Sequence, residues 1–226
     1  MNISGADKEY RRLTTPRAAS IAGILFGLLF AASLALMRDA IPAGMSTDMS
    51  WVEAGAWKIN LALGLMPFAG IAYLWFIGVI RDKLGEFEDR FFSTVFFGSS
   101  LLFLAMVFVS MAIAGGILAT YHMIDGETPD YTVIYFGRAL MLQISNVYAL
   151  RMAGVTMISL ATIWIRTQLM PRWLAVVTFS LALALLVVVN YSPWVTLIYP
   201  AWVLLISVFI LWLRYKHPEV QSPASE

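Results

Sequence analysis

The sequence predicts an all-α polytopic membrane protein, a bundle of six transmembrane helices that forms one domain over residues 1–226. Of these residues 60% are hydrophobic and only 13% are charged, whereas a soluble domain carries about 25% charged residues. Apolar runs of about eighteen residues or more recur along the chain, and such runs are the signal of membrane-spanning helices.

The expected spans follow one another with short connections. They cover about residues 17–37, 59–80, 91–119, 146–165, 172–190 and 194–213, with residues 1–15 and 217–226 as flexible cytoplasmic tails. Three predicted helix entries put a side-chain acceptor at the N-cap and proline at the first helical position, namely Thr15-Pro16, Thr128-Pro129 and Ser192-Pro193. Pro171 is expected to open the fifth helix in the same way. Ser50-Trp-Val-Glu53 forms a capping box, so we expect the second helix to begin outside the membrane.

The first apolar run differs from a secretory signal peptide. Basic residues precede it, but the run from Ala18 to Met37 is 20 residues long, whereas the apolar region of a signal peptide has about 7–15 residues. We therefore expect an uncleaved first helix.

The fourth span is expected to be irregular or to project from the membrane. No proline interrupts the chain between Pro129 and Met170. A helix of that length would measure about 60 Å, twice the roughly 30 Å of the hydrocarbon core. We expect residues 131–143 to lie along the outer interface or beyond it, with a bend near Gly137 or Asn146.

The basic residues predict that both termini are cytoplasmic, because positively charged loops stay on that side. Eleven of the fifteen Lys and Arg fall there, namely Lys8, Arg11, Arg12, Arg17, Arg81, Lys83, Arg90, Arg166, Arg172, Arg214 and Lys216. The other four are Arg38, Lys58, Arg138 and Arg151. An interfacial aromatic belt accompanies the cytoplasmic arginines, formed by Trp75, Trp164, Trp173 and Trp212.

Two resemblances bear on the class of protein. The loop segment Gly78-x-x-x-Asp82-Lys83-x-Gly85 resembles the motif between the second and third helices of major-facilitator transporters. That motif continues with basic residues, whereas Glu86, Glu88 and Asp89 follow here, so we interpret the segment as a solvated turn that sets the topology.

The chain as a whole resembles six-span bacterial inner-membrane proteins without an assigned function, through Arg17-Ala-Ala-Ser-Ile-Ala-Gly-Ile-Leu-Phe26 and the general layout. This resemblance implies the plasma membrane, specifically the bacterial inner membrane, and carries no activity over.

The side chains that catalysis needs are scarce. The chain has no Cys, and its two histidines, His122 and His217, are expected on opposite sides of the membrane, so they cannot jointly hold haem or a metal. His122 begins a loop that also contains Asp125, Glu127 and Asp130. We interpret this loop as flexible and acidic rather than as a cation site.

All fourteen acids fall outside the spans, which argues against proton coupling. We therefore expect neither an enzyme nor a cofactor, and a net charge of +1 suggests no nucleic-acid partner.

Small residues form a stripe on the first helix. Gly23, Gly27 and Ala31 are spaced four apart, and such a stripe lets a neighbouring backbone approach closely. Packing within the bundle is the favoured interpretation, and a homodimer seam is the alternative.

The candidate ligand site centres on Arg151. Pro67 and Pro200 lie at nearly the depth of Arg151 and are expected to kink their helices, which frees the carbonyls of Leu63 and Thr196. A guanidinium in the bundle can bridge such carbonyls or hold an anion. Asn146, Gln143 and Arg138 would line the approach from outside. In the alternative interpretation Arg151 extends outward to the interface or to Asp130.

Three classes of function remain from the sequence. The first is a small transporter, channel or ligand-binding membrane protein with a polar layer around Arg151. The second is a non-catalytic accessory or assembly subunit, with a second copy or another membrane protein as its partner. The third, an enzyme acting on a lipid or quinone in the bilayer, is the least supported, because the catalytic side chains are missing.

Overall fold

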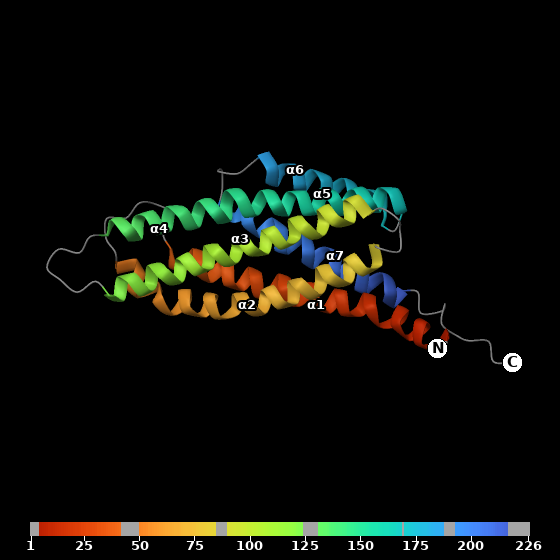
Figure 1. Ribbon diagram of the computed structural model, residues 1–226, viewed down its shortest axis with the longest axis horizontal. Coiled ribbons are helices and arrows are strands. Elements are labelled where there is room, and N and C mark those ends of the chain that lie inside the picture. Colours follow the sequence, from red (N-terminus) through yellow and green to blue (C-terminus); the bar gives the residue numbers. More distant parts are fainter. Residues whose placement is uncertain are drawn as a thin grey trace.

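The computed structural model describes residues 5–41, 50–84, 90–123, 131–168, 170–187 and 193–216, and these residues form helices and short turns without a strand. The elements are α1 (Gly5–Ala40), α2 (Ser50–Leu84), α3 (Arg90–Met123), α4 (Thr132–Gln143), the π-helix η1 (Ile144–Ala149), α5 (Leu150–Thr167), α6 (Arg172–Val187), the 3₁₀-helix η2 (Pro193–Leu197) and α7 (Ile198–Lys216). The predicted all-α class is confirmed. The helices run along the long axis of an elongated bundle (Figure 1).

Five helical segments of the described chain are long and apolar enough to cross a membrane. They are Ala18–Ala40, Ser50–Asp82, Phe91–Met123, Thr132–Thr167 and Val195–Trp212. A shorter apolar helix, α6, has 16 residues. Helices satisfy their backbone hydrogen bonds internally, and this architecture is the one expected of an integral membrane protein. Large apolar side chains on the outer surface, such as Phe68 and Trp75, are mostly exposed and would face lipid.

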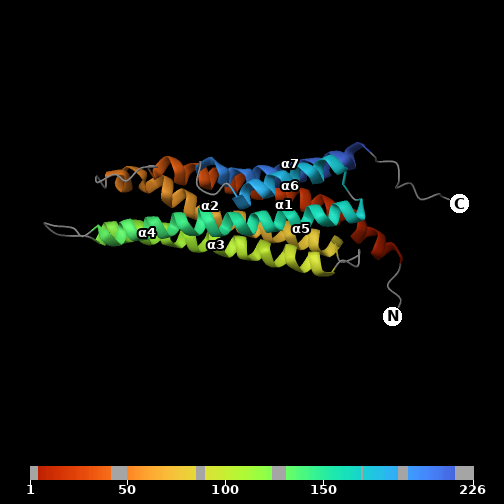
Figure 2. The same ribbon diagram turned by 90° about the horizontal axis from the view of Figure 1, so that it is seen from above.

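The helices close into a ring. The helix α1 packs against α2 and α7, whereas α3 packs against α2, α4 and α5, and α5 packs against α6. The ring closes between α6 and α7, where Trp202 Nε1 donates to Thr178 Oγ1 over 3.0 Å and the ring of Trp173 meets Phe209 edge-on. The two views agree on this arrangement, and they place the start of α1 and the end of α7 at the same end of the bundle (Figures 1 and 2).

Helix boundaries differ from the sequence expectation mainly at α1. This helix begins at Gly5 and runs through Thr15 and Pro16, so the helix start predicted there is wrong. A proline removes one bond of the helical ladder, and here the helix continues on both sides of it. The helix α2 begins at Ser50, as its capping box predicts. Thr128-Pro129, Ser192 and the predicted tail 217–226 lie outside the described residues.

The predicted irregularity of the fourth span is confirmed, and its form is a π-helix. Residues 132–167 are helical throughout, but Ile144–Ala149 adopts the wider π form around Asn146. A π-helix widens the turn locally. The helix α4 packs against α3 and continues the line of α5 (Figures 1 and 2). The 36 residues of Thr132–Thr167 extend about 54 Å, and the position of residues 131–143 relative to the outer interface stays a prediction.

Small residues on α1 lie against α7. A methyl group on Gly23 would overlap Ser207 Oγ and meet the ring of Phe76, and one on Gly27 would overlap Leu204. Ala31 is half-buried. The close approach at the two glycines is therefore made inside the bundle, between α1 and its neighbours.

Candidate functional site

The four polar residues singled out by the sequence lie on one continuous helical segment. Arg151 is half-buried on α5, and its Nη1 donates to the carbonyl of Val147 in the π-helix over 3.4 Å. Asn146 is half-buried and its Oδ1 accepts from Ser145 Oγ over 3.4 Å. Gln143 is exposed at the end of α4, whereas Arg138 is buried with 9% exposure. The contact described for Arg151 is thus within its own helix, and α5 packs on α3 and α6.

The two prolines occupy different environments. Pro67 lies in the interior of α2 and is exposed. Pro200 is the third residue of α7, directly after the 3₁₀-helix, and is buried. Thr196, whose carbonyl Pro200 was expected to free, accepts at its Oγ1 a hydrogen bond from Arg38 Nη2 over 2.5 Å. The arginine beside Thr196 is therefore Arg38 of α1.

The centre of the bundle holds a polar cluster that sequence reasoning did not assemble. Tyr73 of α2 and Tyr199 of α7 are fully buried, and their hydroxyl groups hydrogen-bond to each other. Tyr73 also interacts with Ser100, and Tyr199 with Thr156. Ser99 Oγ lies 2.9 Å and Ser100 Oγ 3.4 Å from Thr156 Oγ1. We call Tyr73, Ser99, Ser100, Thr156 and Tyr199 the hydroxyl cluster.

Local hydrogen bonds position the three short hydroxyls of the cluster. Ser99 and Ser100 donate to the carbonyls of Val95 and Phe96, each over 2.7 Å, and Thr156 donates to that of Met152 over 3.0 Å. Each bond returns to the carbonyl four residues earlier, which is the usual anchor for Ser and Thr inside a helix. Their oxygens then remain available as acceptors across the bundle, because one hydroxyl both donates and accepts.

An aromatic shell surrounds the two tyrosines. The ring of Phe26 lies 4.6 Å from that of Tyr73, and the ring of Phe103 lies 4.5 Å from that of Tyr199, between centroids. Trp202 stacks on Tyr199 at 5.6 Å and hydrogen-bonds to Thr178. The cluster and its shell draw on α1, α2, α3, α5 and α7, and Trp202 reaches α6 through Thr178.

Charged residues flank the bundle at its two ends. At one end Asp39 forms an ion pair with Lys58. At the other end Arg81 lies over the ring of Phe97 at 4.3 Å, and Arg166 lies over Phe92 at 5.2 Å. An arginine over an aromatic ring is held by the ring quadrupole. The tyrosine pair lies between these ends among uncharged side chains.

No group of three or more His, Cys, Asp or Glu that could hold a metal ion occurs among the described residues. His122 is exposed at the end of α3. The acids expected beside it, Asp125, Glu127 and Asp130, lie outside the described part of the chain, and so does His217.

One signal in the sequence could have pointed to the cluster. Tyrosine in membrane helices is enriched at the interfaces, where its hydroxyl meets water. Tyr73 and Tyr199 instead stand within apolar runs, so each hydroxyl requires a partner inside the protein. Thr156 is followed three residues later by Ser159 on the same helix, but the sequence does not reveal that Thr156 faces the tyrosines.

Comparison with models of protein families, with proteins of described function and with solved structures found no match to this chain. What the site can bind follows from its own side chains. Five hydroxyls offer donors and acceptors without a charged partner among them, and the aromatic shell offers apolar contacts. Such a set suits a small uncharged molecule that makes hydrogen bonds.

Proposed function

We propose that this chain is a six-span membrane transporter with both termini in the cytoplasm, which binds a small neutral polar molecule at the hydroxyl cluster. The observation that carries the proposal is the buried Tyr73–Tyr199 hydroxyl pair, with the hydroxyls of α3 and α5 beside it. Its location would be the plasma membrane, in a bacterium the inner membrane. The helix α6 supplies the additional span, and an even number of crossings agrees with α1 starting where α7 ends (Figure 1).

The depth of the cluster supports a substrate site. Ser100 lies ten residues after Arg90, and Thr156 lies ten residues before Arg166. Each interval is about 15 Å of helix, which is half of the roughly 30 Å hydrocarbon core. Secondary transporters bind their substrates near this midplane, between helices.

The hydrogen bonding of the cluster suits a closed state that opens for a ligand. A buried hydroxyl without a partner costs about 1–3 kcal/mol. In the closed bundle Ser99, Ser100 and Thr156 donate to backbone carbonyls and the two tyrosine hydroxyls bond to each other. A ligand that offers both donors and acceptors would replace the Tyr73–Tyr199 bond. The cluster contains neither a carboxylate nor a histidine, so we infer binding rather than catalysis.

The segment around Arg151 would serve the approach to the cluster. Arg151 lies five residues before Thr156, about 8 Å along α5, and the π-helix Ile144–Ala149 precedes it. Such π segments frequently mark functional positions in helices. In this proposal the π-helix is where α5 changes its register when the bundle opens, and Arg151 and Asn146 border the entry.

An accessory or assembly role is the alternative. It was expected to use the groove on the first helix and the charged cytoplasmic loop as contact surfaces for a partner. Gly23 and Gly27 lie against residues of this chain, including Ser207 and Leu204. This contact supports the transporter proposal over a partner docked in that groove, and residues 85–89 of the loop lie outside the described part of the chain.

The test is a thermal-stability screen of the detergent-solubilised protein against polyols, sugars, amides and nucleosides. We expect one class to raise the melting temperature, since a ligand at 100 times its Kd stabilises by about 2.7 kcal/mol. Tyr73→Phe and Tyr199→Phe should abolish that shift. The matched control is Tyr215→Phe, because Tyr215 is 90% exposed near the end of α7. The proposal fails if no class shifts the melting temperature, or if both cluster variants keep the shift.

A further inference from the structure

The helices of the ring divide into two groups, and the hydroxyl cluster lies between them. The first group is α1 with its neighbours α2 and α7, including η2 before α7, and the second is α5 with its neighbours α3 and α6. The groups meet along two seams, α2 with α3 and α6 with α7. Tyr73 and Tyr199 belong to the first group, whereas Ser99, Ser100 and Thr156 belong to the second. A relative movement of the two groups would therefore divide the cluster.

The interactions between the groups are distributed unequally along the bundle. We call the end that carries Arg38 and Lys58 the outer end, and the end that carries Arg81 the inner end. Three contacts of aromatic rings join the groups on the inner side of the cluster, namely Trp164 with Trp202, Trp173 with Phe209 and Arg81 with Phe97.

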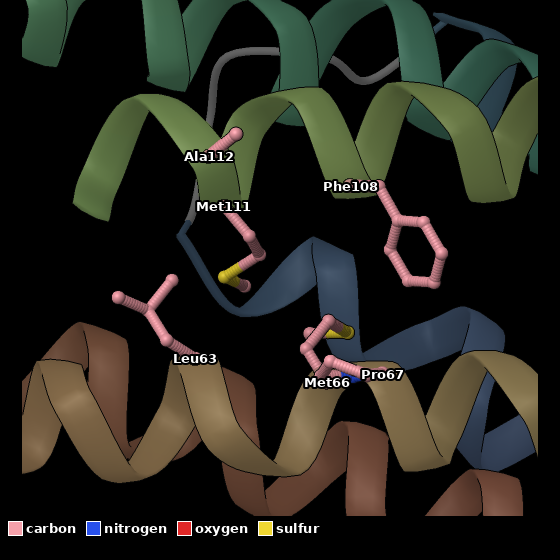
Figure 3. A pocket seen from close by; sticks show the side chains of 6 residues that line it. All are labelled: Leu63, Met66, Pro67, Phe108, Met111 and Ala112. Atoms are coloured by element: carbon pink, nitrogen blue, oxygen red, sulfur yellow. The ribbon is translucent and has the colours of Figure 1, made fainter. Parts of the chain in front are cut away.

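The outer side of the cluster is joined less firmly. The hydrogen bond of Arg38 and the ion pair of Lys58 both stay within the first group. Apolar contacts between α2 and α3 continue on this side, where Phe108 packs on Gly70, but the surface opens there into a groove of about 210 Å³. The groove is lined by residues that precede Tyr73 on α2 and follow Phe103 on α3 (Figure 3), namely Leu63, Met66, Pro67, Phe108, Met111 and Ala112.

One ring of the second group is inserted among the aromatic rings of the first. Phe103 of α3 is buried, and its ring centroid lies 4.5 Å from that of Tyr199, 5.6 Å from that of Tyr73 and 5.7 Å from that of Phe30. Phe103 lies three residues beyond Ser100 along α3, which is about 4.5 Å closer to the outer end. The ring of Phe103 therefore covers the cluster on its outer side, together with that of Phe30.

We propose that the two groups separate at the outer end and that Phe103 is the gate between this end and the hydroxyl cluster. The inference rests on the proposed function, because it describes how a ligand would reach that site. Phe103 belongs to one group and its three ring partners belong to the other, so the gate opens without breaking a contact inside either group. The contacts on the inner side hold the groups together meanwhile, and the hydroxyls of α3 and α5 become accessible from outside.

The test measures access to a single cysteine in the cluster, since the chain has none of its own. Ser100→Cys replaces a fully buried hydroxyl, and the probe is a cationic methanethiosulfonate reagent that does not cross membranes, applied to intact cells. We expect Phe103→Ala to raise the rate of modification by at least about tenfold, because the ring contacts that hold the gate closed are lost. Phe103→Leu, which keeps a large apolar side chain, should raise it less.

Phe76→Ala is the matched control. Phe76 is as buried as Phe103, and its ring stacks on Tyr73 at 6.4 Å from the inner side, so its loss should loosen the bundle without opening the outer gate. Equal acceleration by the two variants would show general loosening and would overturn the proposal, as would no acceleration by Phe103→Ala. Acceleration only from the membrane face that carries Ser225→Cys would place the opening at the inner end and would also overturn it.

Failure of this inference is separable from failure of the proposed function. A ligand whose thermal shift depends on Tyr73 and Tyr199 would support the proposed site even if Phe103→Ala left the rate of modification unchanged, and the gate alone would then be wrong. In the opposite case, Phe103→Ala would accelerate modification although no class of ligand shifts the melting temperature. That result would support the gate and contradict the proposed function.

Discussion

Arg38 near the end of α1 donates from Nη2 to Thr196 Oγ1 in η2, with 2.5 Å between the atoms. The next residue, Asp39, forms an ion pair with Lys58 of α2. Two consecutive residues therefore tie the end of α1 to both of its neighbours in the ring. The two ties differ in environment, because Thr196 is 8% exposed whereas the side chain of Asp39 is 70% exposed.

This difference predicts unequal coupling energies. In a double-mutant cycle with Arg38→Gln and Thr196→Val, we expect about 1.5–3 kcal/mol, the usual range for a hydrogen bond to a charged group. The matched cycle with Asp39→Asn and Lys58→Gln should give below about 1 kcal/mol, because exposed ion pairs are screened by solvent. The measurement is unfolding in mixed micelles with increasing denaturing detergent. Equal coupling in the two cycles would contradict this interpretation.

Substitution of Gly23 tests the close packing of α1. Gly23→Ala should destabilise the bundle by about 1–3 kcal/mol, because the added methyl group overlaps Ser207 Oγ and overpacking has costs of this size. Gly64→Ala is the control, since nothing lies within 4 Å of a methyl group there. It should stabilise α2 by about 0.5–1 kcal/mol through helix propensity. A Gly23→Ala variant that melts no lower than the unmodified protein would show that α1 does not depend on this contact.

The class of the fold was predictable because it depends on local properties of the chain. Runs of apolar residues specify long helices whatever lies beside them, and the helical segments found here agree with that pattern. The fourth span was expected to be irregular because of its length, but Ser50–Asp82 and Phe91–Met123 have 33 residues each and are α-helical throughout, so length alone does not explain the π-helix. The start of α1 was misjudged at Pro16, because a favourable entry signal does not prevent a helix from beginning earlier.

The hydroxyl cluster was not predictable because it depends on how each helix is rotated about its axis. Tyr73 and Tyr199 are 126 positions apart, and no local pattern couples them. The same limit applies to the pairing of Arg38 with Thr196, which are 158 positions apart. Depth along a helix can be counted from the sequence, and on that basis Arg151 and Thr196 were placed together. Helix rotation and the order of helices in the ring bring Arg38 to Thr196 instead.

The proposed topology can be tested with single cysteines, since the chain has none of its own. A cysteine at Ser225 should react with a membrane-impermeant maleimide only after the cells are permeabilised. A cysteine at Gly126 should react in intact cells, because the loop before the fourth span is expected outside. This outcome follows from the bias of the basic residues toward one side. Labelling of Ser225→Cys in intact cells would refute the arrangement.

The last prediction concerns Arg151. Its bond to Val147 is long, at 3.4 Å, and the side chain is only half-buried. That carbonyl also accepts the N–H of Leu150, so the guanidinium adds little to its satisfaction. We therefore expect Arg151→Gln to change the free energy of unfolding by less than about 1 kcal/mol.

If Arg151 borders the entry to the hydroxyl cluster, the same variant should reduce the ligand-induced rise in melting temperature that we expect for the unmodified protein. Two other arginines provide the comparison. Arg166→Gln, at an exposed position over Phe92, should leave both the stability and the ligand effect unchanged. Arg138→Gln alters a buried side chain and should lower stability by about 1–3 kcal/mol. A loss of stability in Arg151→Gln as large as that in Arg138→Gln would assign Arg151 to the packing of the bundle and not to ligand entry.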